Sequence, residues 1–174
     1  MTSILKVNQI QNTAGTTALE IDGTGIITAD AGIKLGTGTD ILSSFSQGTW
    51  NPEFADQTTA GNVSSTTATY ANYVKIGSLV HINCRFTNIS TSGLTSTGAA
   101  WVRNLPYVSN GESVGAVWRQ SITSSTQLVA RVGFNSSAIR FDRLRDSTDV
   151  TLNIANFTNN AADFALSLTY TTDE

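Results

Sequence analysis

The clearest pattern in the chain is a regular alternation of apolar and polar residues between Leu79 and Asn88. Apolar residues occupy every second position from Val80 to Phe86, and polar residues occupy the positions between them. Successive side chains of a strand leave opposite faces, so this alternation predicts a half-buried β-strand. A turn at Gly77 precedes it, which predicts a hairpin whose apolar face contributes to a sheet core.

Similar short runs recur after Trp50, with turn residues between them. The predicted strands cover residues 66–75, 79–88, 99–105, 113–120, 128–134, 139–141, 150–154 and 163–171. About eight strands separated by turns are typical of a two-layer β-sandwich, so we predict an all-β fold. No window repeats its apolar residues at the helical period, and we expect almost no helix.

The alternation also assigns faces to individual side chains. Cys84 shares the apolar face of its strand, so its thiol should lie in the core. Trp118 alternates in register with Val114 and Ala116, which predicts that it is a core residue too. Trp101 and Arg103 should share one face of their strand. For Trp101 the pattern fits a core position and an exposed binding position equally well.

Residues 1 to 46 differ in composition from the rest of the chain. This difference predicts two regions, residues 1–46 and residues 47–174. Phe45 is the only aromatic residue of the first region, and short aliphatic runs alternate with Gly-Thr-Gly turns. Such a region is too small to close a core alone. We therefore expect it to associate with copies of itself, the alternative being disorder. The residues expected near the axis of a trimer are Ile26, Ile27, Ile33, Leu35, Ile41 and Leu42.

The first residues of the chain suit an extended segment that adds to the sheet edge of a partner protein. Leu5, Val7 and Ile10 alternate imperfectly with polar residues, and backbone hydrogen bonds would supply much of the affinity in such a contact. We expect these three side chains to form an anchor.

Charge and hydropathy exclude several classes of partner. The net charge is −3 over 174 residues, which favours neither a nucleic acid nor an acidic membrane surface as a partner. No apolar run is long enough to cross a bilayer, so we expect no membrane insertion.

The residues that carry catalysis or bind metals are scarce. The single histidine, His81, and the single cysteine, Cys84, fall on opposite faces of one strand, which disfavours a metal site and a catalytic triad. One segment mixes acidic and basic residues, and its pattern indicates a solvated ion-pair loop. That segment contains Arg140, Asp142, Arg143, Arg145, Asp146 and Asp149. We expect no enzyme activity, no cofactor and no metal.

Several motifs resemble those of tail fibres and virion appendages of bacterial viruses, especially marine and cyanobacterial ones. The segment from Ser3 to Ile21 resembles the opening of many such proteins. Gly48-Thr-Trp-Asn-Pro52, Tyr73-Val-Lys-Ile-Gly77, Asn104-Leu-Pro-Tyr107 and the closing run from Phe164 to Tyr170 resemble the β-sandwich at the fibre tips. The stretch from Gly111 to Asn160 carries no motif of that family.

The resemblance implies a homotrimeric virion protein of the tail, made in the host cytoplasm. Its N-terminal part would attach to other tail or baseplate proteins, and a jelly-roll-like C-terminal sandwich would contact a polysaccharide or lipopolysaccharide of the host surface. Trp101 and Arg103 are the candidate receptor contacts, because aromatic rings stack on sugars and arginine binds anionic groups. The connector is unusually short for that family. A purely structural tail component without a receptor remains the alternative.

Overall fold

The computed structural model describes residues 9–11, 14–15, 17–29, 33–34, 41–42, 44–58, 62–144 and 150–173. The chain forms two compact units, residues 1–45 and residues 46–174.

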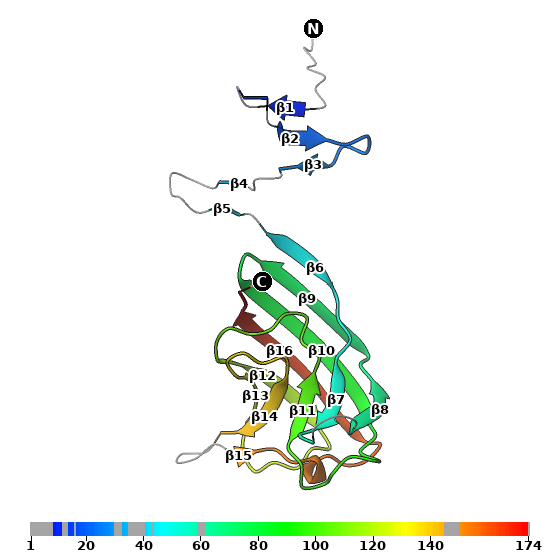
Figure 1. The fold of residues 1–174 in the computed structure, drawn as a ribbon. Coiled ribbons are helices and arrows are strands. Elements are labelled where there is room, and N and C mark those ends of the chain that lie inside the picture. The colour runs from blue at the N-terminus through cyan, green and yellow to red at the C-terminus, as the bar shows by residue number, and fades with distance from the viewer. Residues whose placement is uncertain are drawn as a thin grey trace. The chain divides into compact units, whose positions relative to one another are not determined.

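The described part of the N-terminal unit consists of short antiparallel strands (Figure 1). Three of them form one sheet: β1 (Gln9–Gln11), β2 (Thr17–Ile21) and β3 (Ile27–Thr28). Two more form a pair: β4 (Ile33–Lys34) and β5 (Ile41–Leu42). The turn between β2 and β3 is ordered by Asp22, whose carboxylate accepts hydrogen bonds from the backbone N–H groups of Thr24 and Ile26.

The C-terminal unit is built from one continuous sheet of eleven strands among the described residues. Its first half runs in the order β6 (Phe45–Thr49), β9 (Tyr70–Ile76), β10 (Leu79–Ile89), β16 (Ala162–Thr171) and β12 (Ser113–Gln120). Its second half continues with β13 (Leu128–Val132), β14 (Ile139–Arg143), β11 (Ala100–Arg103), β7 (Glu53–Asp56) and β8 (Val63–Thr67), and β15 (Val150–Thr151) pairs with β14.

The sheet curls so that its two halves face each other, which makes two layers (Figure 1). Phenylalanine side chains from both layers meet in the core. Phe54 of β7 lies 5.9 Å from Phe164 of β16 between ring centroids, and Phe141 of β14 lies 4.9 Å from Phe164. β8 is the last strand in the sheet order, and the hydroxyl of its Ser64 donates to the carbonyl of Ser90, just after β10 in the other half. The predicted all-β sandwich class is confirmed.

The β9–β10 hairpin confirms the predicted alternation. Val80, Ile82, Cys84 and Phe86 are fully buried, and Gly77 in the turn has a φ of 58°, a conformation that glycine adopts without strain. Burial raises the pKa of the Cys84 thiol to about 12, because an apolar environment disfavours the thiolate. The predicted core position of Cys84 is therefore confirmed.

The face assignment of β12 was wrong. Trp118 is 50% exposed and Val114 is 60% exposed, so this apolar face points to solvent. The inward face instead carries Arg119, whose guanidinium donates to the backbone carbonyls of Ile122 and Ser124. A shift of one residue in register exchanges the two faces of a strand. The apolar pattern of residues 113–120 does not fix this register, and its apolar face was therefore predicted to point inward.

Gly115 explains why β12 takes this register. Its neighbour Ala116 pairs with β16 on one side, and Gly115 itself pairs with Ala130 of β13 on the other, at the place where the sheet bends from one layer into the next. A Cβ atom built on Gly115 would lie 2.2 Å from the carbonyl oxygen of Ser167. Only glycine fits such a corner, where two backbones approach each other closely.

The predicted strand over residues 150–154 is shorter than expected. Strand β15 ends at Thr151, and a 3₁₀ turn, η1 (Ile154–Asn156), follows. Leu152 and Ile154 are nevertheless buried, so the apolar residues predicted the core correctly even where they did not predict the strand. No helix among the described residues is long and apolar enough to cross a membrane.

Candidate functional site

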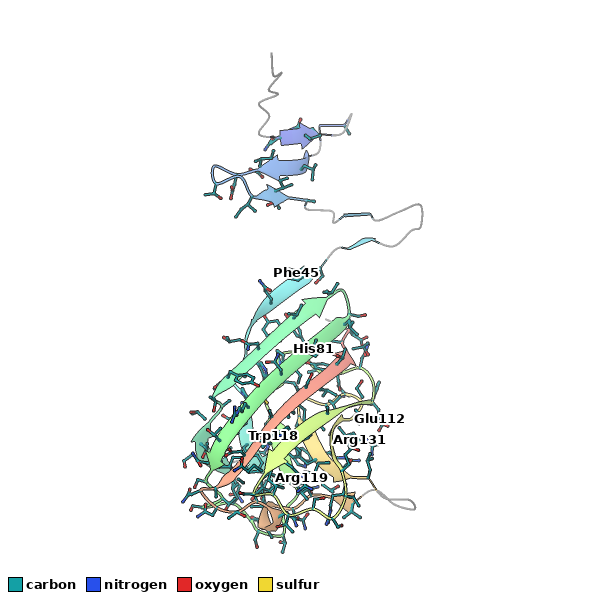
Figure 2. All side chains as sticks on the ribbon, turned by 180° about the vertical axis from the view of Figure 1, so that it is seen from behind. Phe45, His81, Glu112, Trp118, Arg119 and Arg131 are labelled. Atoms are coloured by element: carbon teal, nitrogen blue, oxygen red, sulfur yellow. The ribbon has the colours of Figure 1, made fainter. Side chains whose placement is uncertain are left out.

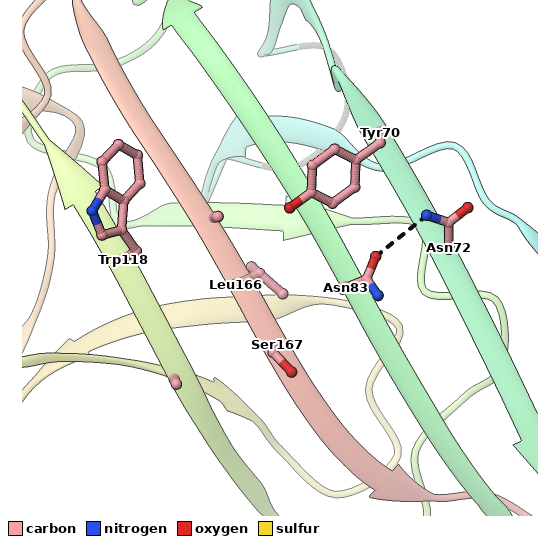
Figure 3. Close-up of a pocket in the computed structure, with 8 residues that line it drawn as sticks. Tyr70, Asn72, Asn83, Trp118, Leu166 and Ser167 are labelled. Atoms are coloured by element: carbon pink, nitrogen blue, oxygen red, sulfur yellow. Dashed lines mark hydrogen bonds between the residues drawn. The ribbon is translucent and has the colours of Figure 1, made fainter.

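The outer face of the first layer carries a row of side chains that crosses four strands. Arg85 of β10 is the register partner of Tyr70 in β9 and of Ala165 in β16. Ala165 is in turn the partner of Trp118 in β12. The exposed aromatic rings of Tyr70 and Trp118 therefore stand at the two ends of the row, with Arg85 and the small Ala165 between them. Figure 3 shows both rings.

A second, polar row runs beside the first. Asn72 pairs with Asn83, Asn83 with Ser167, and Ser167 with Ala116. The amide of Asn72 donates to the side-chain oxygen of Asn83 over 3.4 Å, as the dashed line in Figure 3 shows. The two rows together line an open groove of about 690 Å³. We call this surface the aromatic groove, formed by Tyr70, Asn72, Asn83, Ala116, Trp118, Ala165, Leu166 and Ser167.

The chemistry of the aromatic groove suits a sugar chain. Neighbouring strands lie about 4.8 Å apart, so the rings of Tyr70 and Trp118, three strands apart, are separated by roughly 14 Å at their backbones. Asn72, Asn83 and Ser167 supply amide and hydroxyl groups beside the rings, and Ala116, Ala165 and Leu166 supply apolar surface. Arg85, next to the groove, packs its guanidinium 5.6 Å from the centre of the Trp118 ring, which helps to fix that side chain. Figure 2 shows Trp118 of β12 on this face of the sheet, and His81 on β10, with β16 between the two strands.

A second hollow, of about 290 Å³, lies on the other layer. We call it the arginine pocket. Its residues come from β11, β13, β14 and the turns beside them, with Glu112 just before β12: Trp101, Glu112, Arg131, Gly133, Phe134, Asn135, Ser136, Ala138 and Arg140. Trp101 is the register partner of Arg140, and Arg140 is the partner of Arg131, so a tryptophan and two arginines lie side by side on three strands.

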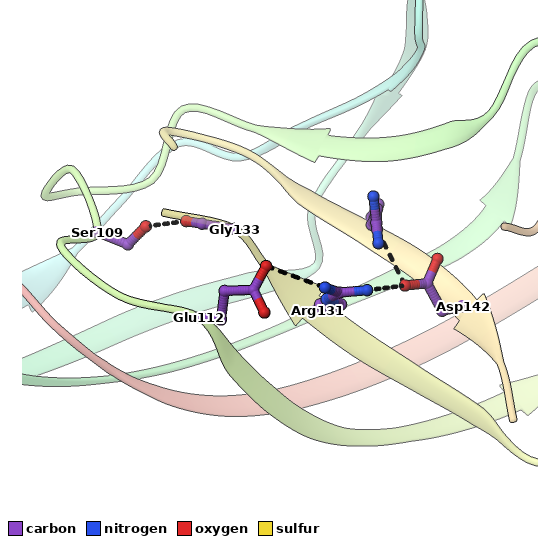
Figure 4. Close-up of polar contacts among 6 residues, drawn as sticks. Ser109, Glu112, Arg131, Gly133 and Asp142 are labelled. Atoms are coloured by element: carbon purple, nitrogen blue, oxygen red, sulfur yellow. Dashed lines mark hydrogen bonds and ion pairs between the residues drawn. The ribbon is translucent and has the colours of Figure 1, made fainter. Parts of the chain in front are cut away.

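Ion pairs hold the arginines of this pocket in place. The guanidinium of Arg131 contacts Glu112 at 2.9 Å and Asp142 at 3.7 Å, and Arg140 donates through Nε to Asp142 at 2.9 Å. Figure 4 shows Arg131 between the two carboxylates. The side chain of Asp142 is only 2% exposed. The expected solvated loop is therefore wrong for Arg140, Asp142 and Arg143, which belong to β14, while 145–149 lie outside the described residues.

The two predicted receptor contacts have different surroundings. Trp101 and Arg103 share the half-buried face of β11, opposite the buried Ala100 and Val102, as the alternation predicted. Trp101 lines the arginine pocket, whereas the guanidinium of Arg103 donates to the backbone carbonyls of Asp56 and Thr58. Arg103 thus fastens the end of β7, and its part in receptor binding stays a prediction.

The predicted anchor and trimer residues are described only in part. Ile10 is half exposed, and Ile26 and Ile27 are each 63% exposed. Leu5, Val7 and Leu35 lie outside the described residues, as do the side chains of Ile33, Ile41 and Leu42. The described aliphatic side chains thus remain largely uncovered in a single chain.

Sequence reasoning missed most of both hollows. The alternation in residues 113–120 predicts a strand, but it does not show which face of that strand points into the core, and the prediction of a core Trp118 is wrong for this reason. Tyr70 falls within the predicted strand over residues 66–75, and nothing in its local pattern marks it as a binding residue. Arg131 and Arg140 lie nine residues apart in the sequence, and only the β13–β14 register brings them together. No group of three or more histidine, cysteine or carboxylate side chains in the described part of the chain could hold a metal ion.

Comparison with known proteins gives a likeness of fold. No protein-family model matches the sequence, and no curated protein matches it. Among solved structures, the Dettilon tailspike protein superposes on 73% of this chain with a TM-score of 0.53 and 10% sequence identity. The chain spans about a quarter of that tailspike, 24% of its length. At this identity the likeness shows a shared fold.

Proposed function

We propose that this protein is a tail appendage of a bacterial virus and that its C-terminal unit binds a host-surface glycan through the aromatic groove. The fold likeness to a tailspike supports the location on the virion tail. The observation that carries the binding role is the pair of exposed rings, Tyr70 and Trp118, in one groove with the amide and hydroxyl groups of Asn72, Asn83 and Ser167. Aromatic rings present apolar faces for sugars, and the amide and hydroxyl groups supply hydrogen bonds.

The shape of the aromatic groove favours a polysaccharide over a small metabolite. Small-molecule sites enclose most of their ligand, whereas this groove lies open along the sheet face. Its lining residues carry no charge at neutral pH, and the guanidinium of Arg85, between the two rings, packs against Trp118, so the groove suits a glycan segment rich in hydroxyl groups. The proposed activity is binding without hydrolysis. Release of reducing sugar from a bound polysaccharide would contradict this part of the proposal.

Replacing Trp118 with alanine should weaken glycan binding at least about tenfold, which is the usual effect of removing an aromatic contact at the centre of a site. Tyr70→Ala should have a similar effect. The measurement is binding of the full-length protein to immobilised lipopolysaccharides and capsular polysaccharides from a panel of bacteria. Thermal unfolding of each variant should show that the fold is retained.

Leu144→Ala is the matched control, because Leu144 is also a large apolar residue exposed on the surface but lies outside the groove. It should bind as the unmodified protein does. The proposal fails if no polysaccharide binds, or if Trp118→Ala and Tyr70→Ala bind as tightly as Leu144→Ala.

The N-terminal unit is proposed to form the trimer and to attach the protein to other tail or baseplate proteins. Exposed Ile26 and Ile27 support this role, since isolated small sheets need a partner to bury their apolar residues. Light scattering of the full-length protein should give three times the monomer mass. Replacing Ile26 and Ile27 together with serine should shift the protein toward monomers. A folded monomer of the unmodified protein at micromolar concentration would contradict the proposal.

A purely structural tail component is the second candidate. Val114 and Leu79 are exposed on the same outer face as the aromatic groove, and another tail protein could cover such apolar side chains. In that case the purified protein would bind no polysaccharide, whereas virions carrying Trp118→Ala would incorporate less of it.

A further inference from the structure

The arginine pocket combines several features that lower stability. Arg131 and Arg140 are direct register partners on neighbouring strands, and like charges in that arrangement repel each other. The Nε1 of Trp101 and the Oδ1 of Asp142 are buried and have no hydrogen-bond partner among the described residues. Each such group lowers stability, because it has lost its hydrogen bonds to water without gaining others. Natural sequences tend to break stability rules of this kind at functional sites.

One guanidinium in this pocket remains available to a ligand. Glu112 and Asp142 both contact Arg131, whereas Arg140 contacts Asp142 through Nε alone. Its two terminal nitrogens make no bond to another described residue, and its side chain is 40% exposed. Asp142 therefore fixes the orientation of the Arg140 fork and leaves its outer edge open. Such a fork matches the geometry of a carboxylate, which it can bind through two parallel hydrogen bonds.

The rest of the pocket suits a sugar ring attached to that carboxylate. Trp101 lies beside Arg140 in the register, and Phe134, which is 73% exposed, lines the same hollow. Asn135 and Ser136 add polar groups. The volume of about 290 Å³ lies at the small end of ligand pockets, which corresponds to one sugar residue and not to a chain.

We infer that the arginine pocket binds one acidic sugar residue, such as a uronic acid, with its carboxylate on Arg140. This inference extends the proposed function, because it takes the ligand to be a glycan and adds a second site, selective for a negative charge, to the aromatic groove. Glu112 borders the pocket and repels the ligand's negative charge, so it limits the affinity.

The test is a titration of the isotope-labelled full-length protein with sodium D-glucuronate, followed by NMR of the Trp101 indole and Arg140 Nε–H signals. D-glucose serves as the uncharged sugar and sodium acetate as the carboxylate without a ring. Glucuronate should shift these signals in a saturable way, and glucose and acetate should each bind at least tenfold more weakly. Equal affinity for glucose would overturn the role of the carboxylate, and equal affinity for acetate would overturn the role of the sugar.

Two variants with opposite expected effects check the assignment of roles. Arg140→Gln removes the fork and should weaken glucuronate binding at least tenfold. Glu112→Gln removes an exposed competing charge and should tighten binding severalfold at low salt, so the inference stays testable even if Arg140→Gln does not fold. Weaker or unchanged binding by Glu112→Gln would overturn it.

Arg85→Gln is the control, since Arg85 lies next to the aromatic groove, and it should leave glucuronate binding unchanged. Trp118→Ala separates this inference from the proposed function. If Trp118→Ala loses polysaccharide binding but keeps glucuronate binding, both sites stand. Saturable glucuronate binding by a protein that binds no polysaccharide through the aromatic groove would contradict the proposed function alone.

Discussion

Replacing Gly115 with alanine should destabilise the C-terminal unit by about 3 kcal/mol or more, near or beyond the upper end of the usual cost of overpacking. The added Cβ would lie 2.2 Å from the carbonyl oxygen of Ser167 and 2.9 Å from the Cα of Leu168. Both neighbours are backbone atoms of β16, which cannot move aside as a flexible side chain would. The strand would have to separate from β16 at the corner of the sheet.

Urea unfolding followed by tryptophan fluorescence measures this loss as a lower midpoint. Gly133→Ala is the matched control, because a Cβ at Gly133 meets no atom within 4 Å. Its effect should stay within about 0.5 kcal/mol. If Gly115→Ala unfolds at the same urea concentration as Gly133→Ala, the backbones of β12 and β16 do not approach each other as closely as described. The outward orientation of Trp118 then loses its explanation.

Replacing Asp56 with alanine should cost about 3 kcal/mol or more, because it removes a buried carboxylate that accepts several part-buried hydrogen bonds. The fully buried carboxylate of Asp56 accepts hydrogen bonds from the backbone N–H of Thr58 at 2.8 Å, from the backbone N–H of Thr95 at 2.6 Å and from the amide of Asn62 at 2.8 Å. It thereby joins the end of β7 to the loop between β10 and β11. Urea unfolding at pH 7 measures the loss.

The same carboxylate should make stability depend on pH. Burial alone would raise its pKa, but the hydrogen bonds from Thr58, Thr95 and Asn62 outweigh burial and hold the pKa of Asp56 far below its usual range. A carboxyl group whose pKa is lowered by folding stabilises the protein above its unfolded pKa, about 3.9, and this contribution is lost as pH falls toward the folded pKa. The stability gap between the unmodified protein and Asp56→Asn should therefore shrink below about pH 4.

Asp163→Ala is the control for this prediction. Asp163 accepts one backbone hydrogen bond, from Asn88 at 2.7 Å, near the surface. Its replacement should cost about 1 kcal/mol, the net value of an ordinary hydrogen bond. An equal cost for Asp56→Ala and Asp163→Ala would show that the buried hydrogen-bond cluster adds nothing beyond a surface contact.

Local sequence determined the strands whose two faces differ clearly in polarity. In β10 and β16 every second residue is apolar, and the predicted inward residues, from Val80 to Phe86 and from Phe164 to Tyr170, are buried. A period of two is a property of the extended backbone itself, so it predicts both the strand and its buried face without knowledge of the partners. The all-β class follows from the repetition of such runs.

Tertiary structure decided which way β12 faces. Its apolar residues predicted an inward Trp118, but the corner at Gly115 requires the residue facing β16 to lack a side chain, and that sets the opposite register. Close approach of two backbones depends on where the sheet bends, which no local pattern records. The outward tryptophan of the aromatic groove is the consequence.

Cross-strand register also decided the composition of both hollows. Tyr70, Arg85, Trp118 and Ala165 are far apart in the sequence and form one row only because four strands pair in that order. For the same reason, the sequence could not predict that Arg140 and Arg131 lie beside Trp101 in the arginine pocket. The sequence determined which residue types were present and on which alternating positions they stood, whereas strand order and register determined which of them meet, because those depend on contacts between distant segments.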